Sequence, residues 1–363
     1  MRPLIRALTD NKLNLLLAAA PASWVLDEWM PGSPWIFITA AASLVPLAGI
    51  IGLGTEQLAH RAGPGIGGLL NATFGNAAEL IIALVALREH HVALVKASIT
   101  GSIVGNLLLV LGASFFVGGL GRRAQKFHRT AATNATAMLF LAVVALIMPA
   151  VFDLALYGSL AARPPALDRL SFWSAVVLIV AYVGNLIYAF TSQRDLLRST
   201  QEGEMDRALP TPTAIGLLAA GTLLTTVQAE LLVGALQPAL TNFGFTELFV
   251  GAVVIAVIGN AAEHYSAITA ARRDQMTLAV EISIGSSAQI ALFVAPLLVL
   301  YSFAIGQPMS LLFNAFEITA ITLSVLATAI VVVDGESNWV EGLQLMSVYL
   351  ILALALYFVP APG

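Results

Sequence analysis

The chain contains no cysteine, and only 10% of its 363 residues are charged. The missing thiols exclude disulfide bonds and metal sites built on thiolates. Hydrophobic residues make up 58% of the sequence. An ordinary soluble domain is excluded, because it could not bury that much apolar surface with so few charged residues to cover it. No pattern typical of nucleic-acid binding is present. The sequence is therefore that of an integral membrane protein, whose solvent is the lipid bilayer.

Long apolar segments recur along the whole chain, and each can form a helix that crosses a hydrocarbon core of about 30 Å. They do not alternate apolar with polar residues as the strands of a membrane barrel do. We therefore predict an all-α polytopic membrane protein. About eleven transmembrane helices are expected, at residues 13–29, 35–59, 65–88, 92–117, 130–151, 170–191, 212–238, 246–271, 278–303, 309–333 and 340–359.

Lysine and arginine are distributed unequally between the predicted loops. If the N-terminus is cytoplasmic, thirteen of the seventeen cations fall on the cytoplasmic side, including a cluster between Arg122 and Arg129. The four on the outer side are Arg88, Lys96, Arg163 and Arg169. This bias predicts a cytoplasmic N-terminus and a C-terminus outside.

One motif, GNAAE, occurs twice, at Gly75–Glu79 and at Gly259–Glu263. The shift along the chain that superposes these copies, which we name the repeat shift, also superposes Gly101-Ser102 on Gly285-Ser286 and indicates an internal duplication. Two repeats of five helices follow, and the odd number gives them inverted topology, as in many secondary transporters. The predicted parts are an extra N-terminal helix and loop at 1–34, a first repeat at 35–191, a cytoplasmic linker at 192–211 and a second repeat at 212–363.

The repeated glutamates lie well inside their predicted spans. An ionised carboxylate there is costly unless another group compensates it, and no span holds a lysine or arginine at comparable depth. The asparagine and glycine that precede each glutamate share its helix face, and neighbouring spans add hydroxyl and amide oxygens. The candidate metal ligands are Glu79, Glu263, Asn76, Asn260, Gly75 and Gly259, and the candidate pathway-lining residues are Ser102, Asn106, Ser286 and Gln289.

Carboxylate, amide, hydroxyl and carbonyl oxygens suit a hard cation, and two carboxylates with several neutral oxygens suit Ca²⁺ better than Mg²⁺. Two ionised glutamates carry a charge of −2, which one Ca²⁺ or two protons neutralise. Because a low dielectric disfavours the empty, charged site, protons should replace calcium when it leaves. The residues therefore predict a divalent cation/proton antiporter. It needs no cofactor, since Ca²⁺ and H⁺ are the transported ions.

Four segments resemble the calcium/proton exchanger (CAX) branch of the calcium/cation antiporter superfamily. They are Gly68–Glu79 (GLLNATFGNAAE), Gly259–His264 (GNAAEH), Gly285–Phe293 (GSSAQIALF) and Asp334–Trp339 (DGESNW). The resemblance covers nearly everything from residue 52 onward, and His264 separates this branch from the sodium/calcium exchangers. It implies that protons drive transport and that Glu79 and Glu263 alternate between calcium and protons.

The chain departs from this branch in two places. The acidic helix often described between the halves is only hinted at by Glu202, Glu204 and Asp206, which puts calcium regulation through that segment in doubt. Position 281 is occupied by glutamate, whereas the resemblance predicts a small residue there. The sequence indicates no role for this carboxylate.

Four further titratable residues could relay protons: Glu56, Glu230, His264 and Glu317. Each also has a simpler interpretation. Glu56 fits a helix end at the membrane interface. His264 points about 100° away from Glu263 and could pack against another helix. Glu317 could hydrogen-bond a neighbouring helix.

The main alternative function is a Na⁺-driven or monovalent cation/proton exchanger. A channel is disfavoured, because paired carboxylates on inverted repeats favour tight alternating binding over weak multi-site binding. An enzyme, such as an intramembrane hydrolase, has no evident need for the repeat. Short loops suggest a prokaryotic inner membrane, where exchange would export Ca²⁺ from the cytoplasm. The sequence leaves a homo-oligomer open.

Overall fold

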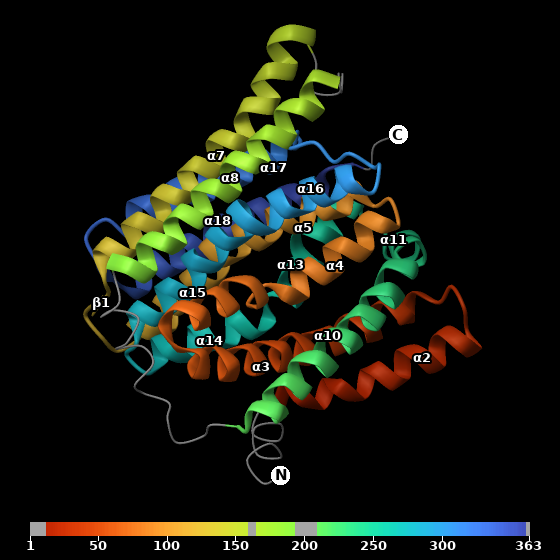
Figure 1. The fold of residues 1–363 in the computed structure, drawn as a ribbon, viewed down its shortest axis with the longest axis horizontal. Coiled ribbons are helices and arrows are strands. Elements are labelled where there is room, and N and C mark those ends of the chain that lie inside the picture. Colours follow the sequence, from red (N-terminus) through yellow and green to blue (C-terminus); the bar gives the residue numbers. More distant parts are fainter. Residues whose placement is uncertain (1–11, 159–164, 193–208, 361–363) are drawn as a thin grey trace. The chain divides into compact units, whose positions relative to one another are not determined.

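The computed structural model describes residues 12–158, 165–192 and 209–360, and almost all of its elements are helices (Figure 1). The elements are η1 (Lys12–Ala18), α2 (Ala19–Trp29), α3 (Pro34–Phe74), α4 (Ala77–Arg88), α5 (Val92–Val104), η2 (Gly105–Val110), α6 (Leu111–Gly119), β1 (Gln125–Lys126), α7 (Arg129–Tyr157), α8 (Pro165–Ser192), α10 (Thr211–Gly234), α11 (Leu236–Phe243), α12 (Glu247–Phe249), η4 (Val250–Ile255), α13 (Ala256–Gly259), α14 (Ala261–Arg272), α15 (Met276–Gln289), η5 (Ile290–Val294), α16 (Ala295–Ala304), α17 (Ala315–Val331), β2 (Glu336–Ser337) and α18 (Trp339–Phe358). Most of the predicted linker at 192–211, including Glu202, Glu204 and Asp206, lies outside the described residues.

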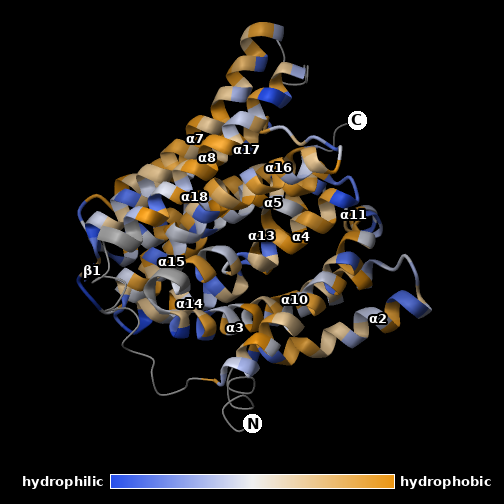
Figure 2. Ribbon diagram, in the orientation of Figure 1, coloured by the Kyte–Doolittle hydropathy of each residue, from blue (hydrophilic) through white to orange (hydrophobic). Residues whose placement is uncertain are grey.

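Seven helices in the described ranges are long and apolar enough to cross a membrane. They are Pro34–Gly63, Val92–Gly119, Arg129–Tyr157, Pro165–Tyr188, Thr211–Gly234, Met276–Ala304 and Trp339–Phe358. Large apolar side chains remain exposed on them, such as Phe140 on α7, Val180 on α8 and Ile351 on α18. Figure 2 shows the same apolar character along these helices. A surface of this kind is stable against lipid and not against water.

The chain divides into two compact units, which we describe separately. Unit 1 contains residues up to Glu89, Gly184–Phe245 and Ile258–Ala262, and unit 2 contains the rest. In unit 1, α3 packs along α10. They approach closely at Gly54, where a Cβ atom would lie 2.9 Å from the backbone nitrogen of Leu218. Glycine there lets the two helices pack backbone to backbone.

A buried amide also joins three helices of unit 1. The Oε1 atom of Gln228 on α10 accepts hydrogen bonds from Ser23 on α2, at 2.8 Å, and from Ser43 on α3, at 3.0 Å. Such interhelical polar contacts hold helices together where the apolar surroundings offer no alternative partner. Ser33 and Pro34 begin α3 as N-cap and first helical residue, and Gly63, with φ of +80°, kinks it.

Unit 2 is built around α5, α7 and α15. Helix α5 packs against η4, α6 packs against α18, and α7 packs against α15 and α17. The strands β1 and β2 pair in antiparallel orientation, with Gln125 opposite Ser337. Two capping boxes, Asn314 with Glu317 and Asn338 with Glu341, begin α17 and α18.

The repeat shift found in the sequence also relates local backbone structure. It carries α4 onto α14 residue by residue, and the first residue of α5 onto the first residue of α15. Among the described residues, only His90 and Asp274 are non-glycine residues with positive φ, both at 66°, and the repeat shift relates them. The π-helical segments η2 and η5 begin at nearly equivalent positions. This agreement supports the duplication, while the repeat boundaries at 35–191 and 212–363 remain predictions.

Candidate ion-binding site

Both copies of the GNAAE motif interrupt a helix. In the first copy, α3 ends at Phe74 and α4 begins at Ala77, with Asn76 outside helical geometry at φ −103° and ψ 29°. In the second copy, α13 ends at Gly259 and α14 begins at Ala261. The predicted spans 65–88 and 246–271 are therefore each two helices rather than one. Hydropathy does not reveal the first break, because α3 and α4 are both strongly apolar. The second break separates an apolar segment from the more polar α14, but the polar residues of α14 do not mark the position of the break.

The breaks place each glutamate in the first turn of a helix, Glu79 in α4 and Glu263 in α14. A helix N-terminus has unpaired N–H groups and a positive dipole end, which stabilise a carboxylate. The preceding helix ends in carbonyl oxygens that lack helical partners, and these suit a cation. The helix break at the glycine and asparagine of the motif thus provides N–H groups that can stabilise the glutamate, and carbonyl oxygens that can bind a cation.

Glu79 lies against the backbone of the second motif, within unit 1. A Cβ atom on Gly259 would lie 3.0 Å from Cγ and 3.4 Å from Oε1 of Glu79. The residue therefore has to be small, and its missing side chain leaves the carboxylate next to main chain. Asn76 and Asn260 are both buried, at 1% exposure. The glutamate of one copy and the glycine of the other thus meet, although they come from opposite halves of the sequence.

Glu263 takes part in a chain of hydrogen bonds within unit 2. The hydroxyl of Ser286 on α15 donates to Oε2 of Glu263 at 2.8 Å. The amide of Asn106 in η2 donates to the Ser286 hydroxyl at 3.1 Å. Ser286 and Asn106 are buried, and both were predicted to line the pathway. The bonds orient the carboxylate and place a neutral hydroxyl oxygen, that of Ser286, beside it.

The other predicted lining residues lie on the same helices. Ser102 is buried on α5 and is related to Ser286 by the repeat shift, and Gln289 is the last residue of α15. Each is followed closely by a π-helical segment. Such segments often occur at functional sites, since they widen the helix and redirect its groups. Within the described residues, no three His, Cys, Asp or Glu side chains cluster as a metal site. A cation site here depends on neutral oxygens beside the glutamates.

Glu317 has a structural task that the sequence did not reveal. It is buried, and its carboxylate accepts a hydrogen bond from the backbone N–H of Asn314 at 2.9 Å as part of a capping box. Its charge interacts with that of Lys96 on α5. Lys96 was expected on the outer side as a loop-proximal cation, but the structure buries it to 9% exposure. Lys96 is the fifth residue of α5, so the protein buries it near one end of that helix.

Lys96 holds a short non-helical segment, Met309–Phe313, which we name the buried strap. Its ammonium group donates to the carbonyl oxygen of Leu312 at 2.7 Å and lies 5.7 Å from the ring centre of Phe313. Two hydroxyl groups accept from strap N–H groups: Ser302 from Met309 at 2.8 Å, and Ser171 from Leu311 at 2.9 Å. The predicted span at 309–333 thus begins late, because α17 starts only at Ala315.

The remaining predicted relay residues lie elsewhere on their helices. Glu56 on α3 and Glu230 on α10 have exposed side chains. His264 follows Glu263 on α14 and is partly buried. Their relay role stays a prediction.

Comparisons with known proteins give these features a context. Residues 32–191 and 213–358 match the family described as sodium/calcium exchanger protein. The chain is 42% identical to the Ca²⁺/H⁺ antiporter of Synechocystis sp., over 97% of this chain and 99% of that protein. It is 38% identical to the Ca²⁺/H⁺ antiporter ChaA of Bacillus subtilis, over 96% and 99%.

Solved structures agree in fold. The selenium-substituted Ca²⁺/H⁺ antiporter protein YfkE superposes with a TM-score of 0.81 at 36% identity, over 95% of this chain and 98% of that one. Both motif copies lie inside the regions matched by the family, whereas η1 and α2 precede them. The chain is thus a multi-pass membrane protein that belongs to the sodium/calcium exchanger family, in its calcium/proton exchanger branch.

Proposed function

We propose that the protein is a secondary active Ca²⁺/H⁺ antiporter that exports Ca²⁺ from the cytoplasm by alternating access. Glu79 and Glu263 bind Ca²⁺ or protons in alternation, and Asn76, Asn260 and the carbonyl groups around Gly75 and Gly259 complete the ligand set. The observation that carries the proposal is the position of Glu79 against the backbone of Gly259. This contact brings the carboxylate of the first motif next to the main chain of the second motif.

The coupling follows from charge. One Ca²⁺ or two protons neutralise both carboxylates, whereas an empty site keeps two negative charges in a low dielectric. Only the neutralised states then change between inward and outward access, so the two substrates exchange. The names of the relatives, which are Ca²⁺/H⁺ antiporters, support this choice of ions. A Na⁺-driven exchange is the alternative.

We further propose that the protein lies in the inner membrane of a prokaryote, with the N-terminus in the cytoplasm and the C-terminus outside. The basic loop after α6 supports this orientation, because Arg122, Arg123 and Lys126 follow one another there. Inward proton movement along its gradient would then drive Ca²⁺ outward.

The direct test is Ca²⁺ uptake into everted membrane vesicles, with the pH gradient and the Na⁺ gradient imposed separately. Uptake should follow the pH gradient and ignore Na⁺. The variants Glu79→Gln and Glu263→Gln should each lose exchange, because an amide cannot alternate between −1 and 0. Glu89→Gln is the matched control, since Glu89 ends the same helix with an exposed side chain. Near-normal exchange in either amide variant would refute the assignment, and uptake driven by Na⁺ would favour the alternative.

A second test uses the contact at Gly259. In Gly259→Ala the new Cβ forces the Glu79 side chain to move by a few tenths of an ångström, because it would otherwise lie 3.0 Å from Cγ. We expect a raised KM for Ca²⁺ in a folded protein. Gly216→Ala on α10 is the control, since nothing lies within 4 Å of a Cβ at that position. Equal KM values for both variants would contradict a role for this contact in ion binding.

A further inference from the structure

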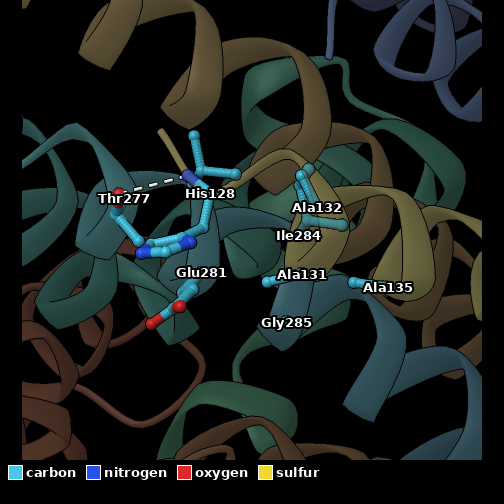
Figure 3. A pocket seen from close by; sticks show the side chains of 9 residues that line it. His128, Ala131, Ala132, Ala135, Thr277, Glu281, Ile284 and Gly285 are labelled. Atoms are coloured by element: carbon cyan, nitrogen blue, oxygen red, sulfur yellow. Dashed lines mark hydrogen bonds between the residues drawn. The ribbon is translucent and has the colours of Figure 1, made fainter. Parts of the chain in front are cut away.

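A pocket of about 100 Å³ lies between α7 and α15 in unit 2 (Figure 3). Most of its wall is apolar, with Ala131, Ala132 and Ala135 among the residues from α7. Its polar residues are His128, Thr277 and Glu281, and the backbone N–H of His128 donates a 3.3 Å hydrogen bond to the Thr277 hydroxyl. The volume admits several water molecules. The pocket is therefore large enough for water beside two titratable side chains, His128 and Glu281.

Glu281 and His128 face the same space. In Figure 3 the imidazole ring of His128 lies near the carboxylate of Glu281, and the two come from different helices. Their charges interact when both are ionised. His128 is the N-cap residue of α7, so its position is fixed by the start of that helix. A carboxylate and an imidazole at one pocket can pass a proton through a water molecule.

Several other charged groups lie near this end of α15, and four of them form two pairs of opposite charge. Lys126 of β1 lies 3.7 Å from Glu336, and Arg122 lies 3.9 Å from Asp274. Arg129, which follows His128, is exposed. These cations disfavour a second calcium ion at the pocket, since like charges repel. The surroundings therefore suit protons better than Ca²⁺.

The helices packed against α15 contribute no nearer titratable group. The segments α6, η2 and η5 contain none. The single lysine of α5, Lys96, donates to the carbonyl oxygen of Leu312. Asp153 of α7 lies well beyond the start of that helix, about 36 Å away along its axis. Within the described residues, His128 is thus the titratable neighbour of Glu281.

The pocket lies close to the hydrogen-bonded chain of Glu263. Glu281 precedes Ser286 on α15 by about 7.5 Å along the helix axis. Gly285, the neighbour of Ser286, lines the pocket itself. Ser286 donates to Glu263. A proton held at Glu281 is therefore about one and a half helical turns from the group that bonds the proposed carrier.

We propose that Glu281 and His128 form a proton-transfer station that exchanges protons between Glu263 and the water on the side of the basic loop 120–128. Hydronium gives a proton to the Glu281 carboxylate, so that an O–H bond of hydronium breaks, an O–H bond of the carboxyl group forms and water is released. The reverse step returns the proton. His128 accepts a proton from hydronium in the same way: an O–H bond of hydronium breaks, an N–H bond forms at the imidazole ring and water is released, and the reverse step returns the proton. The proposal rests on the proposed Ca²⁺/H⁺ exchange.

The test compares wild type, Glu281→Gln and His128→Gln in proteoliposomes, with Glu336→Gln as a control that removes a carboxylate at the same end outside the pocket. Exchange is measured as a function of pH and of Ca²⁺, with and without imidazole as a small diffusible buffer. We expect Glu281→Gln to slow exchange by roughly tenfold at alkaline pH, where free protons are scarce, with an unchanged KM for Ca²⁺. Imidazole should restore most of the rate. His128→Gln should show the same pattern more weakly, and Glu336→Gln should resemble wild type.

Two results would refute the proposed role of Glu281 and His128 in proton transfer. One is a wild-type pH profile in both pocket variants. The other is a rate that falls equally at all pH values and does not respond to imidazole, which would indicate a purely structural role. If wild-type protein itself shows no pH-driven Ca²⁺ transport, the proposed function fails, and this outcome is distinct from the other two.

Discussion

The buried cation Lys96 provides a sharp test of how unit 2 is held together. In Lys96→Met the side chain keeps its length and apolar stem but loses its charge. The change removes the 2.7 Å hydrogen bond to the Leu312 carbonyl and the contact with the Phe313 ring. It also leaves Glu317 buried without the charge of Lys96.

The expected loss of stability follows from these interactions. Lys96→Met leaves the buried carbonyl oxygen of Leu312 without its charged donor, and the loss of a hydrogen bond to a charged group typically costs about 1.5–3 kcal/mol. At about 2 °C per kcal/mol for a chain of this size, the unfolding midpoint should fall by about 3–6 °C. Glu317→Gln removes the remaining charge and preserves the shape. The double variant Lys96→Met/Glu317→Gln should therefore be more stable than the sum of the single changes predicts.

The assay is thermal unfolding of the purified protein in detergent, followed by the fluorescence of its five tryptophans. Lys126→Met serves as the matched control, because this lysine is exposed and its pairing with Glu336 at 3.7 Å should contribute less than about 1 kcal/mol. An unchanged midpoint in Lys96→Met would refute the reasoning. Strict additivity in the double variant would refute the coupling between the two charges.

Two further predictions concern close contacts in unit 2. In Gly101→Ala a Cβ atom would lie 2.0 Å from the backbone oxygen of Ala252, so α5 and η4 must move apart and the unfolding midpoint should drop, whereas Gly105→Ala, with nothing within 4 Å, should leave it unchanged. Equal midpoints would contradict the packing. Ser286→Ala removes the hydrogen bond to Glu263. If that bond contributes about 1.4 kcal/mol to Ca²⁺ binding, the KM for Ca²⁺ in a vesicle assay should rise about tenfold. An unchanged KM would show that the bond does not orient the carboxylate for binding.

Several features of the fold followed from the sequence. Apolar length and the absence of strand-like alternation predicted the helical membrane architecture, which the structural relatives confirm. The repeat shift predicted that Ser102 and Ser286 occupy equivalent positions, and the paired geometry of His90 and Asp274 agrees with it. These properties depend on local sequence, so one chain is enough to find them.

Other features depend on contacts between distant residues and left no periodic signal. Lys96 is buried because the strap, which follows much later in the chain, offers it a carbonyl oxygen. The break at Asn76 interrupts a run that remains apolar on both sides, so hydropathy alone joins α3 to α4. The π-helical segments change the backbone without changing composition. The pocket at Glu281 arises only where α7 begins against α15.

The buried strap also affects where this protein tolerates added sequence. A map of helix connections marks Met309–Phe313 as a loop, and loops are the usual places for epitope tags that report membrane sidedness. Met309 and Leu311 are at most 1% exposed, and their N–H groups are bonded to Ser302 and Ser171, so a tag there would push apart the helices that surround it. Residues 120–124 are all exposed and join α6 to β1, which makes that turn the better place for a tag.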